Sequence, residues 1–171
     1  QFEEATIELL REAHWQYTLG DDIHRKYTDP LIEEDLRNFL AVQYKDKNLT
    51  TSEMDSIVAN LRNTGGQNDY YALRNTFLLY RDGYDFAYSD GRSNPFRLEY
   101  IDFEHPDHNI FRCVNQFVME QGRENRRPDI LLFINGIPVC IIELKNPTKQ
   151  NATIHDAHTQ ICTRYMRDIP A

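Results

Sequence analysis

The sequence contains no apolar run that approaches the ~18–20 residues of a membrane-spanning helix, so we expect no membrane partner. It has 3 cysteines, and none stands in a Cys-x-x-Cys pair, which argues against a zinc knuckle. A Gly-x-x-x-x-Gly-Lys-Ser/Thr phosphate loop is also absent, so we expect no ATP bound in that way. Sparse, unpaired cysteines are typical of a reducing compartment, and we expect a cytoplasmic protein.

Basic residues are also scarce, with 19 Lys and Arg against 27 Asp and Glu and a net charge of −8. This balance argues against nucleic-acid binding by bulk electrostatics. The charge is uneven, because residues 1–120 hold 12 basic and 22 acidic side chains, whereas residues 121–171 hold 7 and 5. If the protein acts on DNA, we expect the DNA to meet the C-terminal third.

The length of 171 residues is enough for one domain with a sizeable core, and we expect a single domain over 1–171. The first residue is not Met, and the segment Met166–Ala171 resembles the interior of a protein, so we expect part of a longer chain. Local signals predict four helices: over 2–14, from Asp29-Pro30 onward, after a Ser52-x-x-Asp55 capping box, and over 68–80.

The residues beyond Pro95 favour strands instead. They predict strands over 96–103, 111–120, 129–134 and 138–145, followed by a helix over 152–167. We therefore predict an α/β (α+β) fold with a central mixed sheet flanked by helices. The helical half would cover about residues 1–94, and the sheet half, which carries the candidate site, about 95–171.

Three charged residues stand at the ends of the last two predicted strands. Asp129 opens one apolar run, and Glu143 and Lys145 end the next, beyond an Asn135-Gly136 turn. Both runs are apolar on both faces, which is typical of strands in the middle of a sheet. Because burying an unpaired charge is costly, charges at these positions indicate a functional site. The alternative is a surface hairpin whose charged ends form an incidental salt bridge.

The turn decides whether Asp129 shares a face with Glu143 and Lys145, because successive strand residues point to opposite sides. A two-residue Asn135-Gly136 turn would place Asp129 opposite Ile142 and separate the charges. A three-residue turn would bring Asp129, Glu143 and Lys145 to one side. We predict the three-residue turn or an equivalent β-bulge.

On one side of the hairpin, Asp129 and Glu143 would offer hard oxygen ligands of the kind that Mg²⁺ prefers. We expect Mn²⁺ to substitute for it. A bound metal ion neutralises phosphate charge and lowers the pKa of a bound water, and Lys145 would position that water or stabilise the transition state. The pattern therefore indicates a metal-dependent phosphodiesterase.

Three segments are more specific than the three charges alone. They are Arg127-Pro128-Asp129, Asn135-Gly136-Ile137-Pro138 and Ile142-Glu143-Leu144-Lys145-Asn146-Pro147. Together they resemble the PD-(D/E)xK nuclease superfamily, and in particular the N-terminal endonuclease domain of the motor (R) subunit of type I restriction enzymes. The resemblance is strong over about 115–170 and weaker over the rest of the chain. It implies a restriction-endonuclease-like core and Mg²⁺-dependent hydrolysis of double-stranded DNA.

The resemblance implies that Asp129 and Glu143 bind the metal and that Lys145 is the catalytic lysine. The family also has a Gln-x-x-x-Tyr element, which Gln160 and Tyr165 match with four residues between them instead of three. On an α-helix this spacing displaces the two side chains from a common face.

Further residues are candidates around this site. An acidic residue of the first helix often completes sites of this superfamily, and we rank Glu4 first, with Glu8 on its face and Glu3 beside it. Arg164 is better aligned with Gln160 on an α-helix than Tyr165 is, and it is a candidate DNA contact. Arg123, Arg126 and Arg127 would hold DNA phosphates near the metal. As ordinary surface residues, these arginines would only balance Glu120 and Glu124.

The resemblance also implies partners in a bacterial or archaeal complex. A C-terminal helicase or translocase motor in the same chain would use ATP, and modification and specificity subunits would supply DNA recognition. Two alternatives stay open. One is another PD-(D/E)xK nuclease, for example of the repair type, and the other is a nuclease-like scaffold that binds DNA or a partner without cutting.

Overall fold

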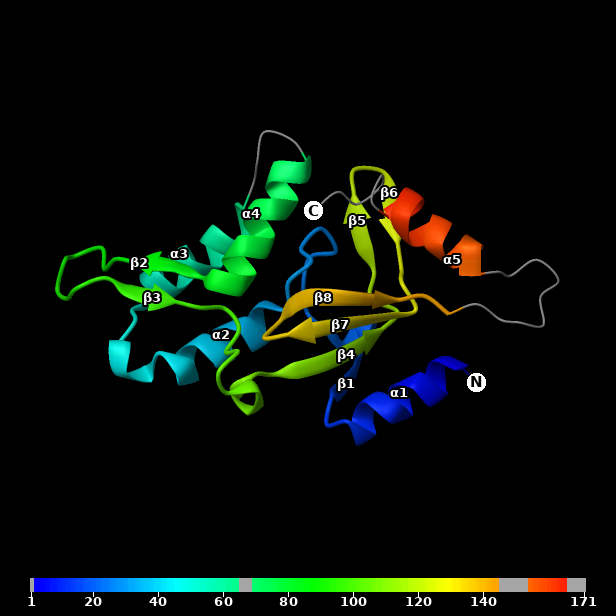
Figure 1. The fold of residues 1–171 in the computed structure, drawn as a ribbon, viewed down its shortest axis with the longest axis horizontal. Coiled ribbons are helices and arrows are strands. Elements are labelled where there is room, and N and C mark those ends of the chain that lie inside the picture. Colours follow the sequence, from blue (N-terminus) through cyan, green and yellow to red (C-terminus); the bar gives the residue numbers. More distant parts are fainter. Residues whose placement is uncertain (1, 65–68, 145–153, 166–171) are drawn as a thin grey trace. The chain divides into compact units, whose positions relative to one another are not determined.

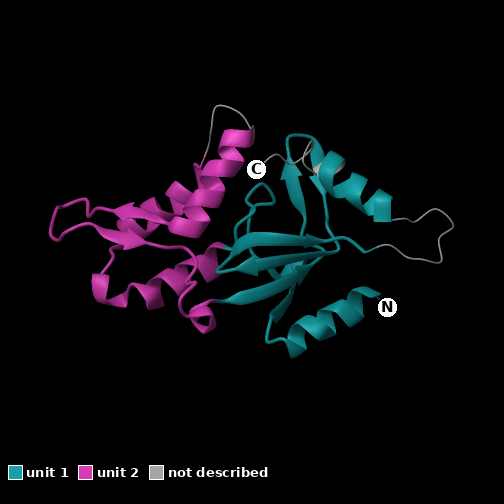
Figure 2. Cartoon of the chain, in the orientation of Figure 1, with its two compact units in different colours: residues 1–32, 110–170 teal, residues 33–109, 171 magenta. Residues whose placement is uncertain are grey.

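The computed structural model describes residues 2–64, 69–144 and 154–165, which fall into two compact units (Figures 1 and 2). Unit 1 covers residues 1–32 and 110–170, and unit 2 covers residues 33–109. These units do not follow the predicted helical and sheet halves, because the chain's first segment belongs with the large sheet. Within the described ranges, no helix is both long and apolar enough to cross a membrane.

Unit 1 is built on a four-stranded sheet of order β1-β4-β7-β8. Strand β1 runs parallel to β4, whereas β4, β7 and β8 pair antiparallel, so the predicted mixed sheet with helices is confirmed. Strand β1 was not predicted, because its four residues are mostly polar and only half-buried at best. The strands are β1 (Gln16–Leu19), β4 (Phe111–Asn115), β7 (Ile130–Ile134) and β8 (Ile137–Ile142).

The two faces of this sheet are covered by different apolar clusters. On one face, Ile7 of α1 (Phe2–Glu12) packs with Cys113 and Ile130. Figure 1 shows α1 lying beside β1 and β4. On the other face, Phe117, Leu131 and Phe133 belong to a second cluster, to which the segment before α2 contributes. The alternation of Ile130 and Leu131 between the clusters is what a strand buried on both faces requires.

The rest of unit 1 forms smaller elements. A hairpin joins β5 (Met119–Gln121) to β6 (Glu124–Arg126), and Gly20–Asp22 forms the short helix η1. The predicted strand 111–120 is therefore two strands, interrupted where Gln116 adopts a φ of 57°. The predicted C-terminal helix is described as α5 (Ile154–Thr159) and a π-helical turn, η4 (Gln160–Tyr165).

Unit 2 is mainly helical, with one small hairpin and a core around Leu36, Ile57 and Tyr100. Its last long helix closes at Gly83, whose φ of 63° suits glycine. Its elements are α2 (Glu33–Gln43), η2 (Lys45–Lys47), α3 (Thr51–Arg62), α4 (Asp69–Asp82), β2 (Tyr84–Phe86), β3 (Phe96–Leu98) and η3 (Pro106–His108).

The predicted helix start at Asp29-Pro30 is wrong. Oδ1 of Asp29 does accept the Leu31 N–H at 3.1 Å, but the next N–H, from Ile32, donates to the Gly136 carbonyl at 2.9 Å. This bond to the β7–β8 turn holds the segment outside helical geometry, so α2 begins at Glu33. A tertiary contact overrides the local helix signal here.

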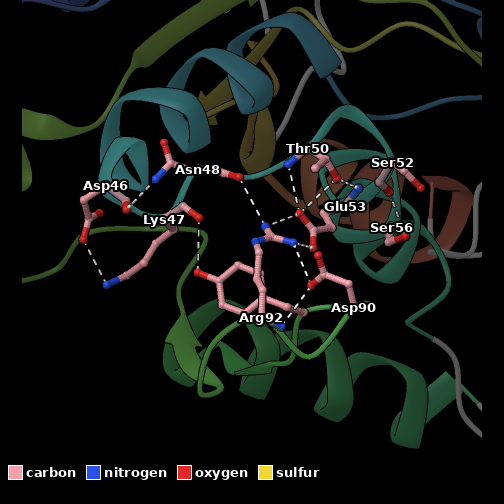
Figure 3. A network of polar contacts seen from close by, with 10 residues as sticks. Asp46, Lys47, Asn48, Thr50, Ser52, Glu53, Ser56, Asp90 and Arg92 are labelled. Carbon is pink, nitrogen blue, oxygen red and sulfur yellow. Dashed lines mark hydrogen bonds and ion pairs between the residues drawn. The ribbon is translucent and has the colours of Figure 1, made fainter.

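The capping box of α3 lies two residues before the predicted one. Thr50 is the N-cap, and its side chain and that of Glu53 cap each other's backbone N–H groups. Figure 3 shows that Arg92 reaches the Glu53 carboxylate with both terminal nitrogens, each at 2.7 Å. Glu53 is only 3% exposed, so this bidentate pair satisfies a buried charge that sits inside a helix cap.

Candidate functional site

Asp129 lies directly before β7, where the chain leaves the buried residue Pro128. Its carbonyl accepts the Gln116 N–H at 3.3 Å, which fixes the backbone against the end of β4. Its side-chain Oδ2 accepts the Leu144 N–H at 2.6 Å, beyond the end of β8. Among the described residues, Oδ1 of Asp129 has no hydrogen-bond donor, so the half-buried carboxylate keeps one oxygen for a ligand.

The β7–β8 connection is a two-residue turn, so the predicted three-residue turn is wrong. Ile134 pairs with Ile137, and Asn135 and Gly136 have φ values of 51° and 76°, as a type I′ turn requires. The alternative, a β-bulge, is confirmed: the register shifts between Leu132 and Phe133.

The bulge shifts the register of β7 and β8 so that the two acidic residues beyond the strand ends face the same side. Beyond it Ile130 pairs with Ile142, the last pair of the two strands, and the same register continued by one residue sets Asp129 opposite Glu143. Residues directly opposite each other in an antiparallel pair point to the same side. The extra residue of the bulge, Val139, is exposed, so its insertion disturbs no core contact. Asp129 and Glu143 are therefore neighbours on one side of the hairpin, at the strand ends.

The turn itself is tied to β4 by a buried asparagine. Asn135 is 0% exposed, and its Oδ1 accepts the Ile110 N–H at 2.7 Å while its own N–H donates to the Ile110 carbonyl at 2.8 Å. This pair of bonds anchors the far end of the hairpin and so sets the register that reaches Asp129.

Glu143 is contacted by Gln160, a third residue that the sequence predicted for the site. Nε2 of Gln160, the first residue of η4, donates a hydrogen bond to Oε1 of Glu143. Gln160 comes from a helix and Glu143 from a strand end, 17 positions apart in the sequence. The structure thus brings together Asp129, Glu143 and Gln160, all of which were predicted site residues.

The π-helical turn changes the expectation for Tyr165. Each turn of a π-helix is closed by an i→i+5 hydrogen bond, so residues five apart lie nearly one above the other along its axis. Gln160 and Tyr165 are the first and last residues of η4. The α-helical geometry assumed for these two residues therefore does not apply to this backbone. The roles of Tyr165 and Arg164 stay predictions.

Lys145 lies outside the described residues. The described part of β8 and its extension stops at Leu144, whose N–H is held by Asp129. The role of Lys145 therefore stays a prediction that rests on its position two residues after Glu143.

An acidic residue of α1 does approach the end of the sheet, but it is Glu3. Its Oε1 accepts hydrogen bonds from Asn115 Nδ2 at 3.0 Å and Gln116 Nε2 at 3.1 Å. Gln116 thus contacts both residues, because its side chain donates to Glu3 and its N–H donates to the Asp129 carbonyl. From the sequence we had ranked Glu4 above Glu3 as the acidic residue that completes the site. Glu4 is exposed on α1, and its role as a metal ligand stays a prediction.

The residues Asn115 and Gln116 were not singled out from the sequence. They end β4, and their amide side chains hold Glu3 while the Gln116 backbone holds Asp129. The Gln116 N–H bond to the Asp129 carbonyl lies one step beyond the Asn115–Ile130 pair, and the left-handed φ of Gln116, 57°, then turns the chain away from β7. The sequence feature that could have identified these two residues is their position as a polar pair directly after the strand residues Phe111–Val114.

The three arginines before Asp129 lie on and after the β5–β6 hairpin. Arg126 forms an ion pair with Glu124, N to O 3.1 Å, and donates to the Asn125 carbonyl at 2.7 Å. This contact agrees with the alternative in which Arg126 balances a nearby acid. Arg123 and Arg127 are exposed, and the DNA-binding role of all three stays a prediction.

The strand ends therefore carry two carboxylates with an amide from a helix, next to the end of β4 and α1. Carboxylate oxygens are the donors that hard divalent cations such as Mg²⁺ prefer, and the open Oδ1 of Asp129 suits such an ion. Asp129 and Glu143 fit a metal ligand pair in donor type. Unit 1 therefore belongs to the mixed α/β folds, and it carries an acidic site at the ends of adjacent strands.

The comparisons with known proteins identify the family. The family described as "Type I restriction enzyme R protein N terminus" matches residues 1–171. The chain is 31% identical to the type I restriction enzyme HindI endonuclease subunit of Haemophilus influenzae over 172 residues, which cover 94% of this chain and 16% of that protein. No solved structure matches at a significant level.

A second relative, from Methanocaldococcus jannaschii, carries the provisional name type I restriction enzyme MjaIXP endonuclease subunit. It is 31% identical over 176 residues, covering 98% of this chain and 17% of that protein. The chain thus spans about a sixth of the length of these relatives. The chain belongs to the family of type I restriction enzyme R protein N termini.

Proposed function

We propose that this chain is the Mg²⁺-dependent endonuclease domain of a type I restriction enzyme, with a PD-(D/E)xK core that hydrolyses phosphodiesters of double-stranded DNA. The observation that carries the proposal is the register of the β7–β8 hairpin, whose continuation by one residue sets Asp129 opposite Glu143, together with the hydrogen bond from the Leu144 N–H to Asp129. The names of the relatives, which describe endonuclease subunits, support the same activity.

Asp129 and Glu143 would hold the metal ion. When bound, the ion neutralises phosphate charge and makes an attacking hydroxide available near neutral pH. Asp129 is fixed for this role by the Leu144 N–H, which leaves Oδ1 open. Gln160 holds Glu143 through Oε1 and so orients its carboxylate. Mn²⁺, which accepts the same oxygen donors, would replace Mg²⁺.

Lys145 would follow Glu143 on the same side of the extended chain, because the two are two residues apart. Its ammonium would stabilise the charge that develops on the scissile phosphate. Glu3, Glu4 and Tyr165 would stand around this centre, where Glu3 is already anchored to the end of β4.

The charge distribution supports delivery of DNA by a larger complex. The chain carries a net charge of −8, and Arg126, one of the candidate DNA contacts, is engaged by Glu124. We therefore propose that the isolated domain binds DNA weakly. In the complete enzyme, a motor in the same chain would use ATP to supply the DNA strand, and modification and specificity subunits would select the site. Tight, salt-sensitive DNA binding by the isolated domain would contradict this division.

The direct test is nicking of supercoiled plasmid in Mg²⁺ or Mn²⁺ by wild type, Asp129→Ala and Lys145→Ala. We expect metal-dependent nicking that both substitutions abolish. Lys45→Ala, which removes an exposed lysine of unit 2, is the matched control and should cut as wild type does. Cutting that survives Asp129→Ala would show that the site lies elsewhere.

A further inference from the structure

A second cluster of potential metal ligands lies in unit 2, in the loop between β3 and β4. Asp102, His105 and His108 each offer one ligand atom, and these atoms all lie within 4.8 Å of one another. Oδ2 of Asp102 lies 3.1 Å from Nδ1 of His108 and 3.7 Å from Nδ1 of His105. Asp102 is buried, whereas both imidazoles are exposed. The cluster therefore combines a fixed carboxylate with two accessible nitrogen donors.

The loop that carries these residues is closed by its own hydrogen bonds. Oδ1 of Asn109 accepts the Asp102 N–H at 2.9 Å, and Nδ2 of Asn109 donates to the Asp102 carbonyl at 2.7 Å. The short helix η3 between the histidines is closed by the His108 N–H, which donates to the His105 carbonyl at 2.9 Å. The backbone that presents the three side chains is thus held before any ligand arrives.

The Asp102 carboxylate is supported on both oxygens. Oδ1 accepts the backbone N–H groups of Glu104 at 3.1 Å and His105 at 2.8 Å, and Oδ2 accepts Nε2 of Gln43 at 3.0 Å. Burial raises the pKa of Asp102, but the bonds from His105, Gln43 and His108 outweigh it and hold that pKa below its ordinary value. A ligating carboxylate that is itself hydrogen-bonded is typical of metal sites.

The distances suit a tetrahedral ion. Bonds of about 2.0–2.1 Å from zinc to nitrogen or oxygen place neighbouring ligand atoms about 3.3 Å apart. The distances of 3.1 and 3.7 Å from Asp102 to the histidines lie on either side of this value. The imidazole rings stack with centroids 4.9 Å apart, and because both are exposed they can turn toward one ion.

We propose that Asp102, His105 and His108 bind one divalent transition-metal ion of the zinc class, with water in the remaining position. Imidazole nitrogen with carboxylate oxygen favours Zn²⁺ over Mg²⁺, which takes oxygen ligands and water. The site is separate from the carboxylates of unit 1 in ligand chemistry as well as in sequence. The ion would cross-link the ends of the loop 102–108 and so stabilise unit 2.

The competing explanation is a loop in which Asp102 only caps backbone N–H groups and His108 donates an ordinary hydrogen bond. Both explanations need Asp102, so substitution of Asp102 would not separate them. The exposed histidines do separate them, because a capped loop does not need His105 and a zinc site needs both.

The experiment is a Zn²⁺ titration of the chain in competition with a chromogenic chelator, in a Glu143→Gln background that weakens the candidate site of unit 1. The variants are His105→Asn, His108→Asn and the double substitution. The matched control is His24→Asn, an exposed histidine of unit 1. Thermal unfolding without metal checks that each variant is folded, and Co²⁺ replaces Zn²⁺ to report tetrahedral geometry by its visible absorption.

We expect one Zn²⁺ per chain, at least ~10-fold weaker binding for each single substitution, and loss of binding and of the Co²⁺ absorption in the double substitution. The control should bind as its parent does. Zn²⁺ should also raise the unfolding temperature of the parent and leave that of the double variant unchanged. Equal binding by parent and double variant, no Zn²⁺ binding by the parent, or equal losses in the control would each overturn the proposal.

Discussion

Two substitutions of Asp129 separate its structural bond from its role as a metal ligand. Asp129→Ala leaves the Leu144 N–H without the acceptor that it has at 2.6 Å. An unsatisfied donor in a half-buried position costs about 1–3 kcal/mol of unfolding free energy. Asp129→Asn keeps an oxygen that can accept this N–H but removes the negative charge. We therefore expect the metal-free stability to fall by about 1–3 kcal/mol in the alanine variant and by much less in the asparagine variant.

The response to Mg²⁺ should be lost in both variants. An ion that binds only the folded protein stabilises it by about 2.7 kcal/mol at 100 times its dissociation constant. The assay is denaturant unfolding with EDTA and with saturating Mg²⁺, and Asp21→Ala, at an exposed acid of η1, is the control for non-specific binding. Equal Mg²⁺ stabilisation of wild type and Asp129→Ala would refute the assignment of this ligand. An asparagine variant that loses as much metal-free stability as the alanine variant would refute the structural role of the hydrogen bond between Asp129 and the Leu144 N–H.

Three further predictions follow from the packing and the polar contacts. Arg92 and the Thr50 N–H lower the pKa of Glu53 from 4.5 to about 2, so Glu53 contributes stability above pH 4.5 that is lost as the pH falls toward about 2. Glu53→Gln should flatten this acid limb in denaturant unfolding measured as a function of pH, and an unchanged limb would contradict it. Ile130→Ala should cost about 2–5 kcal/mol in denaturant unfolding, because Ile130 is 0% exposed, whereas Ile154→Ala, at a residue 89% exposed, should change little. Equal losses from both would show that the described core is wrong. Gln160→Leu removes the hydrogen bond that orients Glu143, so plasmid nicking should need more Mg²⁺ than wild type needs, and an unchanged Mg²⁺ requirement would count against the Gln160–Glu143 contact.

The elements that the sequence predicted well are those whose signals are local. The helices predicted over 2–14 and 68–80 lie close to the observed α1 and α4. The apolar runs gave β7 and β8 to within a few residues. Strand β1 was missed because its polar residues become a strand only by pairing with β4, which lies about a hundred positions later. The start of α2 was wrong for a related reason, since the Ile32 N–H is taken by Gly136.

The candidate site shows the same division. The residue types of Asp129, Glu143 and Gln160 pointed to one site, and the structure brings them together. The sequence predicted a three-residue turn or an equivalent bulge, and only the bulge is found, so the charged residues alone did not show where the one-residue shift that reverses the faces would occur. The contact of Glu3 with the sheet depends on amide side chains at the end of β4, which helical spacing alone does not show. The π-turn of η4 was likewise outside what an α-helical reading of Gln160 and Tyr165 allows.

The most direct test of the central claim uses the complete enzyme of the proposed function, in which this chain would be part of an R subunit that assembles with modification and specificity subunits. Wild type and Glu143→Gln are compared for ATP hydrolysis and for cleavage of DNA that contains the recognition site. We predict that Glu143→Gln keeps DNA-dependent ATP hydrolysis and loses cleavage, because Glu143 serves only the candidate metal site. Cleavage by Glu143→Gln at the wild-type rate would contradict the assignment of this site as the nuclease centre.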